Sequence, residues 1–161
     1  MTRPLYAQLS LPALRANVAR ARELAPGTEL LAVVKANAYG HGLMRLLPAL
    51  AQADGLALLE LDAAIALRTA HYMRRILLLE GFFTPDELPE IAARRLAVVV
   101  HSEDQVRMLE AARLERPLEV FVKVNTGMNR LGFAPADLVR TVERLNHCES
   151  VAVLRLLTHF A

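Results

Sequence analysis

Two lysines are the residues of this chain best suited to covalent chemistry, and each one ends a short apolar run. Lys35 follows residues 31–34, and Lys123 follows residues 120–122. Of the 19 basic residues, 17 are arginine and only these two are lysine. A buried lysine amine can lose its proton and attack an aldehyde or carbon dioxide, whereas a guanidinium stays charged. Lysines at strand ends can also be snorkelling side chains, but the confinement of both lysines to such places favours chemistry.

The elements that must position these lysines are short apolar strands alternating with helices. Strands are predicted at residues 31–34, 56–59, 76–79, 96–100, 118–124 and 151–157, with a further short strand at 5–9. Helices are predicted at about residues 12–25, 44–53, 61–70, 102–112 and 135–145, with another starting at 85. Ser10, Thr84 and Ser102 are suited to cap the helices that follow them. This alternation is typical of βαβ units and of a parallel sheet.

Six parallel strands can form either a doubly wound sheet or most of a βα-barrel. No G-x-G-x-x-G follows the first strand, so a dinucleotide fold loses support. A closed barrel needs eight strands and typically about 250 residues, which is more than this chain offers. In both folds ligands bind at the carboxyl ends of the strands, where Lys35 and Lys123 are expected.

Composition argues against several classes of protein. Apolar residues make up 54% of the chain and charged residues 22%, as in globular proteins. The net charge is only +2, with acids interspersed among the bases, so we expect no nucleic-acid partner. No segment approaches the roughly 20 apolar residues of a membrane span, and no secretion signal is recognisable at the start. The lone Cys148 suits a reducing compartment, so a soluble cytoplasmic protein without a membrane partner is expected.

Three stretches together resemble the alanine racemases, which are pyridoxal 5'-phosphate (PLP) enzymes. AVVKANAYGHG (residues 32–42) resembles their cofactor-lysine signature, and KVNTGMNRLGF (residues 123–133) resembles their K-x-[DN]-[ST]-G-M-x-R-L-G-[FV] segment. LLTHFA (residues 156–161) resembles their M-T-H-F-A segment. The resemblance implies an α/β fold, a parallel βα-barrel of the TIM type with about six of eight strands present. Residues 1–161 would be the N-terminal part of the PLP-binding barrel domain, and residues 1–10 would form a strand normally associated with a C-terminal β-domain.

The resemblance also implies roles for individual residues. Lys35 would be linked covalently to the PLP aldehyde and would then act as the base that removes the α-proton of one alanine enantiomer. Tyr39 would hydrogen-bond the cofactor phosphate, and Arg130 would face the phenolic oxygen of the cofactor and the substrate carboxylate. His159 matches a histidine near the cofactor ring. Lys123 matches a lysine that is carbamylated in many members and holds the arginine, and no residue is assigned to a metal.

Two functional hypotheses follow from the resemblance. The first is a racemase that interconverts L-alanine and D-alanine, supplies cell-wall peptidoglycan and works as a homodimer. Its second base, a tyrosine of the partner subunit, lies in the family beyond the matching segment, so residues 1–161 alone are expected to have little or no activity. The second is a non-catalytic PLP-binding fragment or a single-domain protein of PLP homeostasis. His41 and Asn129 are interpreted as loop residues without a catalytic role, and unpaired sheet edges are expected to cause poor solubility or oligomerisation.

Overall fold

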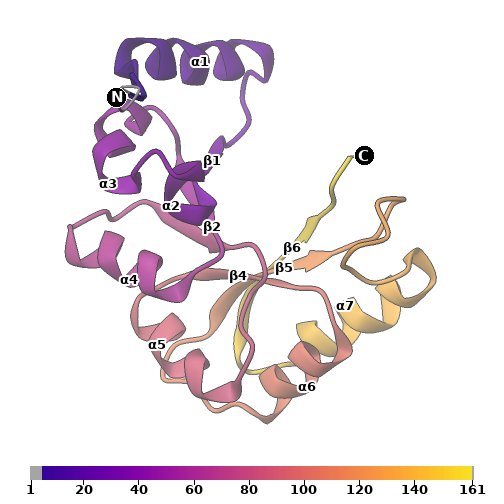
Figure 1. The fold of residues 1–161 in the computed structure, drawn as a ribbon. Helices are drawn as coiled ribbons and strands as arrows, with labels where there is room; N and C mark the ends of the chain where they lie inside the picture. The colour runs from indigo at the N-terminus through magenta and orange to yellow at the C-terminus, as the bar shows by residue number, and fades with distance from the viewer. Residues whose placement is uncertain (1–4, 161) are drawn as a thin grey trace.

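Six parallel strands form one sheet in the computed structural model, which describes residues 5–160. The strands are β1 (Leu31–Val33), β2 (Gly55–Leu58), β3 (Arg75–Leu78), β4 (Ala97–Val100), β5 (Leu118–Lys123) and β6 (Val151–Leu157). They lie side by side in chain order, and every neighbouring pair is parallel. A doubly wound sheet reverses its strand order, whereas a βα-barrel does not. The structure therefore selects the barrel of the two predicted folds, as a sheet that stays open between β1 and β6 in the described residues (Figure 1).

Helices connect the strands and follow one another around the outside of the sheet (Figure 1). The α-helices are α1 (Leu11–Leu24), α3 (Leu43–Leu46), α4 (Leu61–Thr69), α5 (Leu88–Ala93), α6 (Glu103–Ala111) and α7 (Leu138–Asn146). The short element α2 (Lys35–Tyr39) is a left-handed turn, because its residues after Lys35 have positive φ. Short 3₁₀ turns are η1 (Leu47–Leu50), η2 (Pro85–Glu87) and η3 (Pro135–Asp137). Across the described part of the chain, every helix is too short or too polar to cross a membrane.

The predicted helix caps are confirmed. The Ser10 hydroxyl accepts a hydrogen bond from the Ala13 amide at 3.3 Å, at the start of α1. The Ser102 hydroxyl accepts one from the Gln105 amide at 3.4 Å, at the start of α6. The Thr84 amide donates to the Glu87 carboxylate at 3.1 Å, as in a capping box. These bonds satisfy amides that have no partner inside their helices, which is why such residues mark helix starts.

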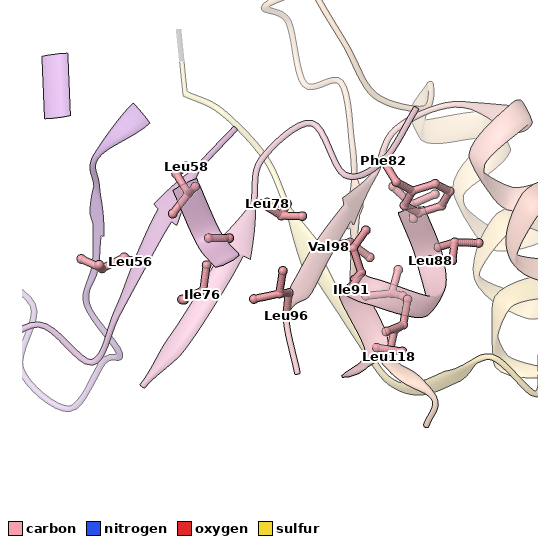
Figure 2. Close-up of a cluster of buried hydrophobic side chains, with 14 of the residues drawn as sticks. Leu56, Leu58, Ile76, Leu78, Phe82, Leu88, Ile91, Leu96, Val98 and Leu118 are labelled. Carbon is pink, nitrogen blue, oxygen red and sulfur yellow. The ribbon is translucent and has the colours of Figure 1, made fainter. Parts of the chain in front are cut away.

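The core lies mainly between the sheet and the helices. Alternate strand residues point to opposite faces, so Leu56 and Leu58 belong to the large helix-side cluster while Ala57 lies on the other face. Figure 2 shows the large cluster, in which leucine, isoleucine and valine side chains of the strands pack against Phe82, Leu88 and others. The second cluster is small and consists of Ala57, Leu77, Ala97 and Val99. The helix-side face therefore supplies most of the apolar burial.

Two predicted elements differ from the structure. Residues 5–10 form neither helix nor strand, so the strand predicted at 5–9 is wrong, and Leu5 is 98% exposed. A strand needs a neighbour to pair its backbone groups, and none of the described strands pairs with this segment. The helix predicted at 44–53 is divided into α3 and η1, because Pro48 has no N–H to continue the α-helical ladder. The assignment of residues 1–161 to a larger domain stays a prediction, and residues 1–4 lie outside the described residues.

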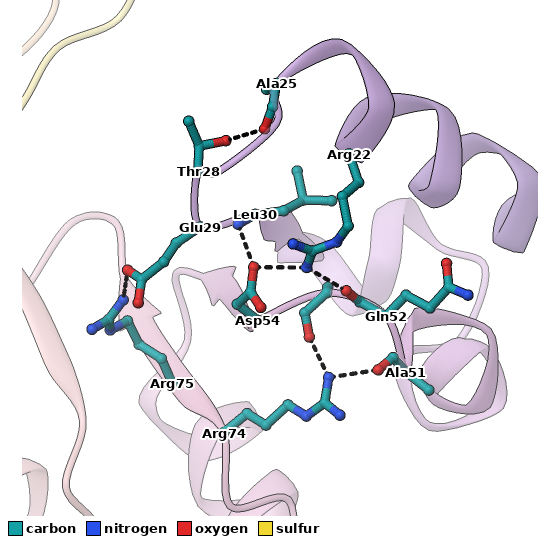
Figure 3. A network of polar contacts seen from close by, with 11 residues as sticks. Arg22, Ala25, Thr28, Glu29, Leu30, Ala51, Gln52, Asp54, Arg74 and Arg75 are labelled. Atoms are coloured by element: carbon teal, nitrogen blue, oxygen red, sulfur yellow. Dashed lines mark hydrogen bonds and ion pairs between the residues drawn. The ribbon is translucent and has the colours of Figure 1, made fainter.

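Charged contacts gather near the amino ends of the first strands (Figure 3). Arg22 of α1 donates to the Asp54 carboxylate at 2.8 Å, and the Leu30 amide donates to the same carboxylate at 2.7 Å. These donors, with the backbone amide contributing most, lower the pKa of the Asp54 carboxyl group. The Arg75 guanidinium pairs with Glu29 at the same end of the sheet. These contacts tie α1 and the strands together at the end opposite the two lysines.

Candidate active site

Lys35 lies where β1 ends, as predicted. The strand runs to Val33, and the Val34 amide still donates to the Ala57 carbonyl of β2 at 2.8 Å. Lys35 is the next residue and its side chain is partly buried. The amine is therefore delivered to the carboxyl end of β1, the end at which βα-barrels hold their ligands. The strand was predicted to be interior, but in the described residues it is an edge strand with β2 as its one partner.

A left-handed turn follows Lys35 where the sequence predicts an irregular loop. Residues 36–39 have φ values of 50°, 53°, 55° and 56°, although none of them is glycine. A left-handed helical residue with a Cβ costs about 1–2 kcal/mol, because the Cβ approaches the next carbonyl oxygen. The turn is closed by the Gly40 amide, which donates to the Ala36 carbonyl at 2.9 Å, and by the Gly42 amide, which donates to the Asn37 carbonyl at 2.9 Å. Such strain persists only where the surroundings over-determine the backbone.

Two side chains that the sequence did not single out hold this turn. The Asn37 amide oxygen accepts a hydrogen bond from the Leu43 backbone N–H at 2.8 Å, which joins the turn to α3. The Glu60 carboxylate, at the start of α4, accepts one from the Ala36 backbone N–H at 3.1 Å. Glu60 was recognisable only as a polar residue directly after a predicted strand. The turn presents Tyr39, which is 59% exposed, on the same short segment as Lys35.

Lys123 lies at the end of β5 and differs from Lys35 in burial. It is only 7% exposed, and it is followed by the loop that carries the exposed Arg130. Burial lowers the pKa of the Lys123 amine, and the positive charge of Arg130 lowers it further. The unmodified pair is therefore repulsive, and Lys123 loses its proton more easily than an ordinary lysine.

The loop between Lys123 and Phe133 is closed at its base. The Phe133 amide donates to the Lys123 carbonyl at 2.9 Å, and the Asn125 amide donates to the Phe133 carbonyl at 2.9 Å. A Cβ added at Gly132 would lie 2.8 Å from the Lys123 carbonyl oxygen, so this glycine permits the close approach. Lys123 therefore lies at the base of a closed loop, and Arg130 lies within that loop.

Every strand has a polar side chain within a few residues of its carboxyl end. In strand order these are Lys35, Glu60, Glu80, His101, Lys123 and His159. His101 was not predicted: its Nε2 lies 3.2 Å from the Glu80 carbonyl oxygen, and burial is the main factor that lowers the pKa of its ring. His159 is exposed two residues after β6. Lys35 follows β1 and Arg130 lies in the loop after β5, so their strands are four places apart in the sheet.

A family model described as "Alanine racemase, N-terminal domain" matches residues 9–161. The chain belongs to this family. Alanine racemase from Nitrosospira multiformis is 51% identical over all 161 residues, which cover 45% of that relative. The chain thus spans a little under half the length of the curated alanine racemases that it matches.

Solved structures agree with the family assignment. The biosynthetic alanine racemase from Pseudomonas aeruginosa has a TM-score of 0.89 and 43% identity, over 94% of this chain and 42% of that one. A histidine racemase from Leuconostoc mesenteroides has a TM-score of 0.82 and 28% identity, over 95% of this chain and 42% of that one. The predicted resemblance and the predicted barrel portion are therefore confirmed, and the family is one of isomerases.

The residues at this edge suit the chemistry of PLP. The cofactor carries an aldehyde, a phenolic oxygen and a phosphate, which call for an amine and for hydrogen-bond donors. Lys35 offers the amine, the adjacent turn offers the Tyr39 hydroxyl, and the exposed Arg130 offers a fork of donors for an anionic oxygen. The donor set fits the group, and the individual roles stay predictions.

Proposed function

We propose that this chain is the cofactor-lysine part of a PLP-dependent alanine racemase and that Lys35 holds the cofactor. The observation that carries the proposal is the place of Lys35 at the carboxyl end of β1, in a segment fixed by a left-handed turn. Rigid placement of an amine is what a covalent cofactor site requires. Alanine is proposed as substrate because a 51% identical relative is an alanine racemase, while the histidine racemase shows that this fold also serves another amino acid.

The proposed reaction is a proton transfer at the α-carbon of the amino acid. Bound PLP supplies an electron sink that makes this proton acidic. Lys35 Nζ removes or returns the proton on one face, Arg130 binds the substrate carboxylate, and Tyr39 binds the cofactor phosphate. Inversion needs a second proton carrier on the opposite face. We assign that role to a tyrosine of the partner subunit in a homodimer, beyond residues 1–161.

Lys123 is proposed to be carbamylated and to hold Arg130. Its neutral amine would attack carbon dioxide, form a C–N bond and release one proton, which leaves an anionic carbamate beside the guanidinium. This would replace a repulsive pair by an attractive one. Its low exposure and lowered pKa support the proposal. Carbon-13 NMR with labelled bicarbonate should show the carbamate signal. Absence of this signal in the unsubstituted chain (the parent) at neutral pH would overturn this assignment.

The racemisation of alanine by residues 1–161 tests the proposed division of roles. With PLP added, we expect a rate at least about a hundredfold below that of a whole alanine racemase, because one of two proton carriers is absent. Formation of D-alanine can be followed with D-amino-acid oxidase. Full racemisation by residues 1–161 would show that no second base from elsewhere is needed.

The cofactor role is tested separately from activity. PLP absorbance should change on binding to the parent chain and to Lys123→Ala, but not on binding to Lys35→Ala. No change in the parent would overturn the cofactor role. The alternative, a non-catalytic PLP-binding chain, makes a different prediction. It predicts that PLP binds at Lys35 while racemisation stays absent even after the remaining family sequence is supplied.

A further inference from the structure

The tip of the loop after β5 is held by two asparagine side chains. The Asn125 side-chain oxygen accepts hydrogen bonds from the backbone N–H of Gly127 at 3.2 Å and from the backbone N–H of Asn129 at 3.0 Å. Its side-chain nitrogen donates to the Asn129 side-chain oxygen at 2.9 Å. The Asn129 side-chain nitrogen in turn donates to the Gly127 carbonyl at 3.0 Å. These four bonds close the turn directly before Arg130.

The backbone at Asn129 has a sign of φ that few side chains tolerate. Its φ is 57°, in the left-handed region that asparagine enters more easily than most residues. The left-handed residue redirects the chain just before Arg130. The sequence offered no role for Asn129, and the structure explains why its residue type matters.

The remaining anchors fix the rest of the loop. Its base is closed between Lys123 and Phe133, as described above. The hydroxyl oxygens of Thr126 and Thr158 lie 2.6 Å apart, which joins the loop to the segment after β6. Arg130 therefore follows a pinned turn and precedes a closed base.

The Arg130 side chain itself is not held by neighbours. Arg130 is exposed, and its guanidinium has no hydrogen-bond or ion-pair partner among residues 5–160. The direction in which the side chain leaves the loop is therefore set by its backbone. A small change of that backbone would displace the guanidinium from a fixed ligand atom, and such displacements weaken catalysis strongly.

We propose that Asn125 and Asn129 act as a pair of positioning residues for Arg130. They set where its guanidinium meets an anionic oxygen, either the carboxylate of the amino-acid substrate or the phenolic oxygen of the cofactor. This rests on the proposed function, in which Arg130 faces such an oxygen. The two asparagines touch neither ligand and act only through the arginine.

The test compares Asn125→Ala with three other variants. Asn125→Asp keeps the side-chain oxygen that accepts from the backbone N–H groups of Gly127 and Asn129. Asn129→Gly permits the left-handed backbone while removing the side-chain amide. Asn146→Ala, at the exposed end of α7, is the matched control. Hydrogen exchange at the backbone N–H groups of Gly127 and Asn129 should be about tenfold faster in Asn125→Ala than in the parent. It should stay unchanged in Asn146→Ala and stay close to the parent rate in Asn125→Asp.

The second readout is the pH midpoint of the absorbance change of bound PLP, which depends on the charge near its phenolic oxygen. Arg130→Ala should shift this midpoint upward, because a cation that favours the anionic form is removed. Asn125→Ala and Asn129→Gly should shift it in the same direction by a smaller amount.

The outcomes separate the two proposals. Absence of any PLP spectrum in the parent would overturn the proposed function, and the positioning role with it. A shift in Arg130→Ala with none in Asn125→Ala or Asn129→Gly would overturn the positioning role alone. Unchanged exchange at Gly127 and Asn129 in a folded Asn125→Ala would also overturn it.

Discussion

The two lysines share a residue type and a place at a strand end, but their surroundings give them different chemistry. Lys123 is 7% exposed and stands beside the positive charge of Arg130, so burial and that charge lower the pKa of its amine. Lys35 is only partly buried and opens a left-handed turn at the edge where ligands bind. These surroundings are consistent with the proposed roles, in which Lys35 reacts with the cofactor and Lys123 holds Arg130 once it is carbamylated.

The burial of Lys123 predicts a pH-dependent stability. Its pKa is lowered on folding, so the unfolded chain binds more protons between the folded value and the ordinary value of about 10.4. The free energy of unfolding should therefore rise as pH increases through this window. Below the folded pKa the buried amine is charged, and the full destabilisation that its charge causes should be present. Lys123→Met, which keeps the volume and removes the charge, should remove this rise.

Urea unfolding of parent and Lys123→Met at several pH values measures the effect. The difference between the two proteins should be largest near neutral pH and should shrink as the solution becomes alkaline. A difference that is constant with pH would show that Lys123 has the same pKa in both states. Carbon dioxide should be excluded from the buffers, because carbamylation would alter the charge of the parent.

At the scale of elements, the site rests on backbone conformations that local sequence does not specify. The turn at residues 36–39 is left-handed. Its Asn37 side chain joins it to Leu43, and the Glu60 carboxylate accepts a hydrogen bond from its Ala36 backbone N–H. The loop that carries Arg130 is closed by backbone bonds between Lys123 and Phe133. Both segments follow strands, so the sheet fixes where each segment begins. The backbone conformation of each loop then sets the direction of its side chains.

The strain in the first turn predicts a stabilising glycine. Ala36 has a φ of 50° and is exposed, so Ala36→Gly removes a steric cost of about 1 kcal/mol. The matched control is Ala16→Gly in the middle of α1, which should destabilise by about 1 kcal/mol. Thermal and urea unfolding should therefore give changes of opposite sign. Destabilisation by both substitutions would contradict a left-handed backbone at Ala36.

The sequence predicts the strands and helix starts well because their signals are local. Apolar runs and the caps at Ser10, Thr84 and Ser102 are short-range patterns, and all six main strands were placed within two residues of the structure. The positive φ values of the Lys35 turn were not predictable from local sequence. The turn is held in part by Glu60, which lies 24 residues away in the chain. Glu60, His101 and Asn125 were missed because a polar residue after a strand is common.

At the scale of the whole molecule, the sheet leaves apolar surface uncovered in the described residues. β1 and β6 each have one strand partner, so each has one unpaired edge. Val33 of β1 is 44% exposed and Leu156 of β6 is 60% exposed. Unpaired edges beside apolar side chains favour pairing with other chains. The hydrophobic pattern of the sequence did not determine the strand order, because it does not indicate which strands are neighbours.

Self-association of residues 1–161 should therefore increase with concentration. Leu156→Glu should reduce it, because a charge on this face opposes apolar contact. Leu24→Glu is the matched control, since Leu24 is 68% exposed at the end of α1 and belongs to no strand. Sedimentation velocity measures the distribution of species. A monomer at all concentrations, with a sharp cooperative melt, would contradict the expectation.

The proposed role of Lys35 as the cofactor lysine can be tested directly, because the chain has only two lysines. The protein is incubated with PLP, reduced with borohydride, digested and examined by peptide mass spectrometry. We predict a reduced PLP adduct on the peptide that contains Lys35, little on the peptide that contains Lys123, and loss of the adduct in Lys35→Arg. Equal labelling of both lysines, or labelling only at Lys123, would contradict the assignment of Lys35 as the cofactor lysine.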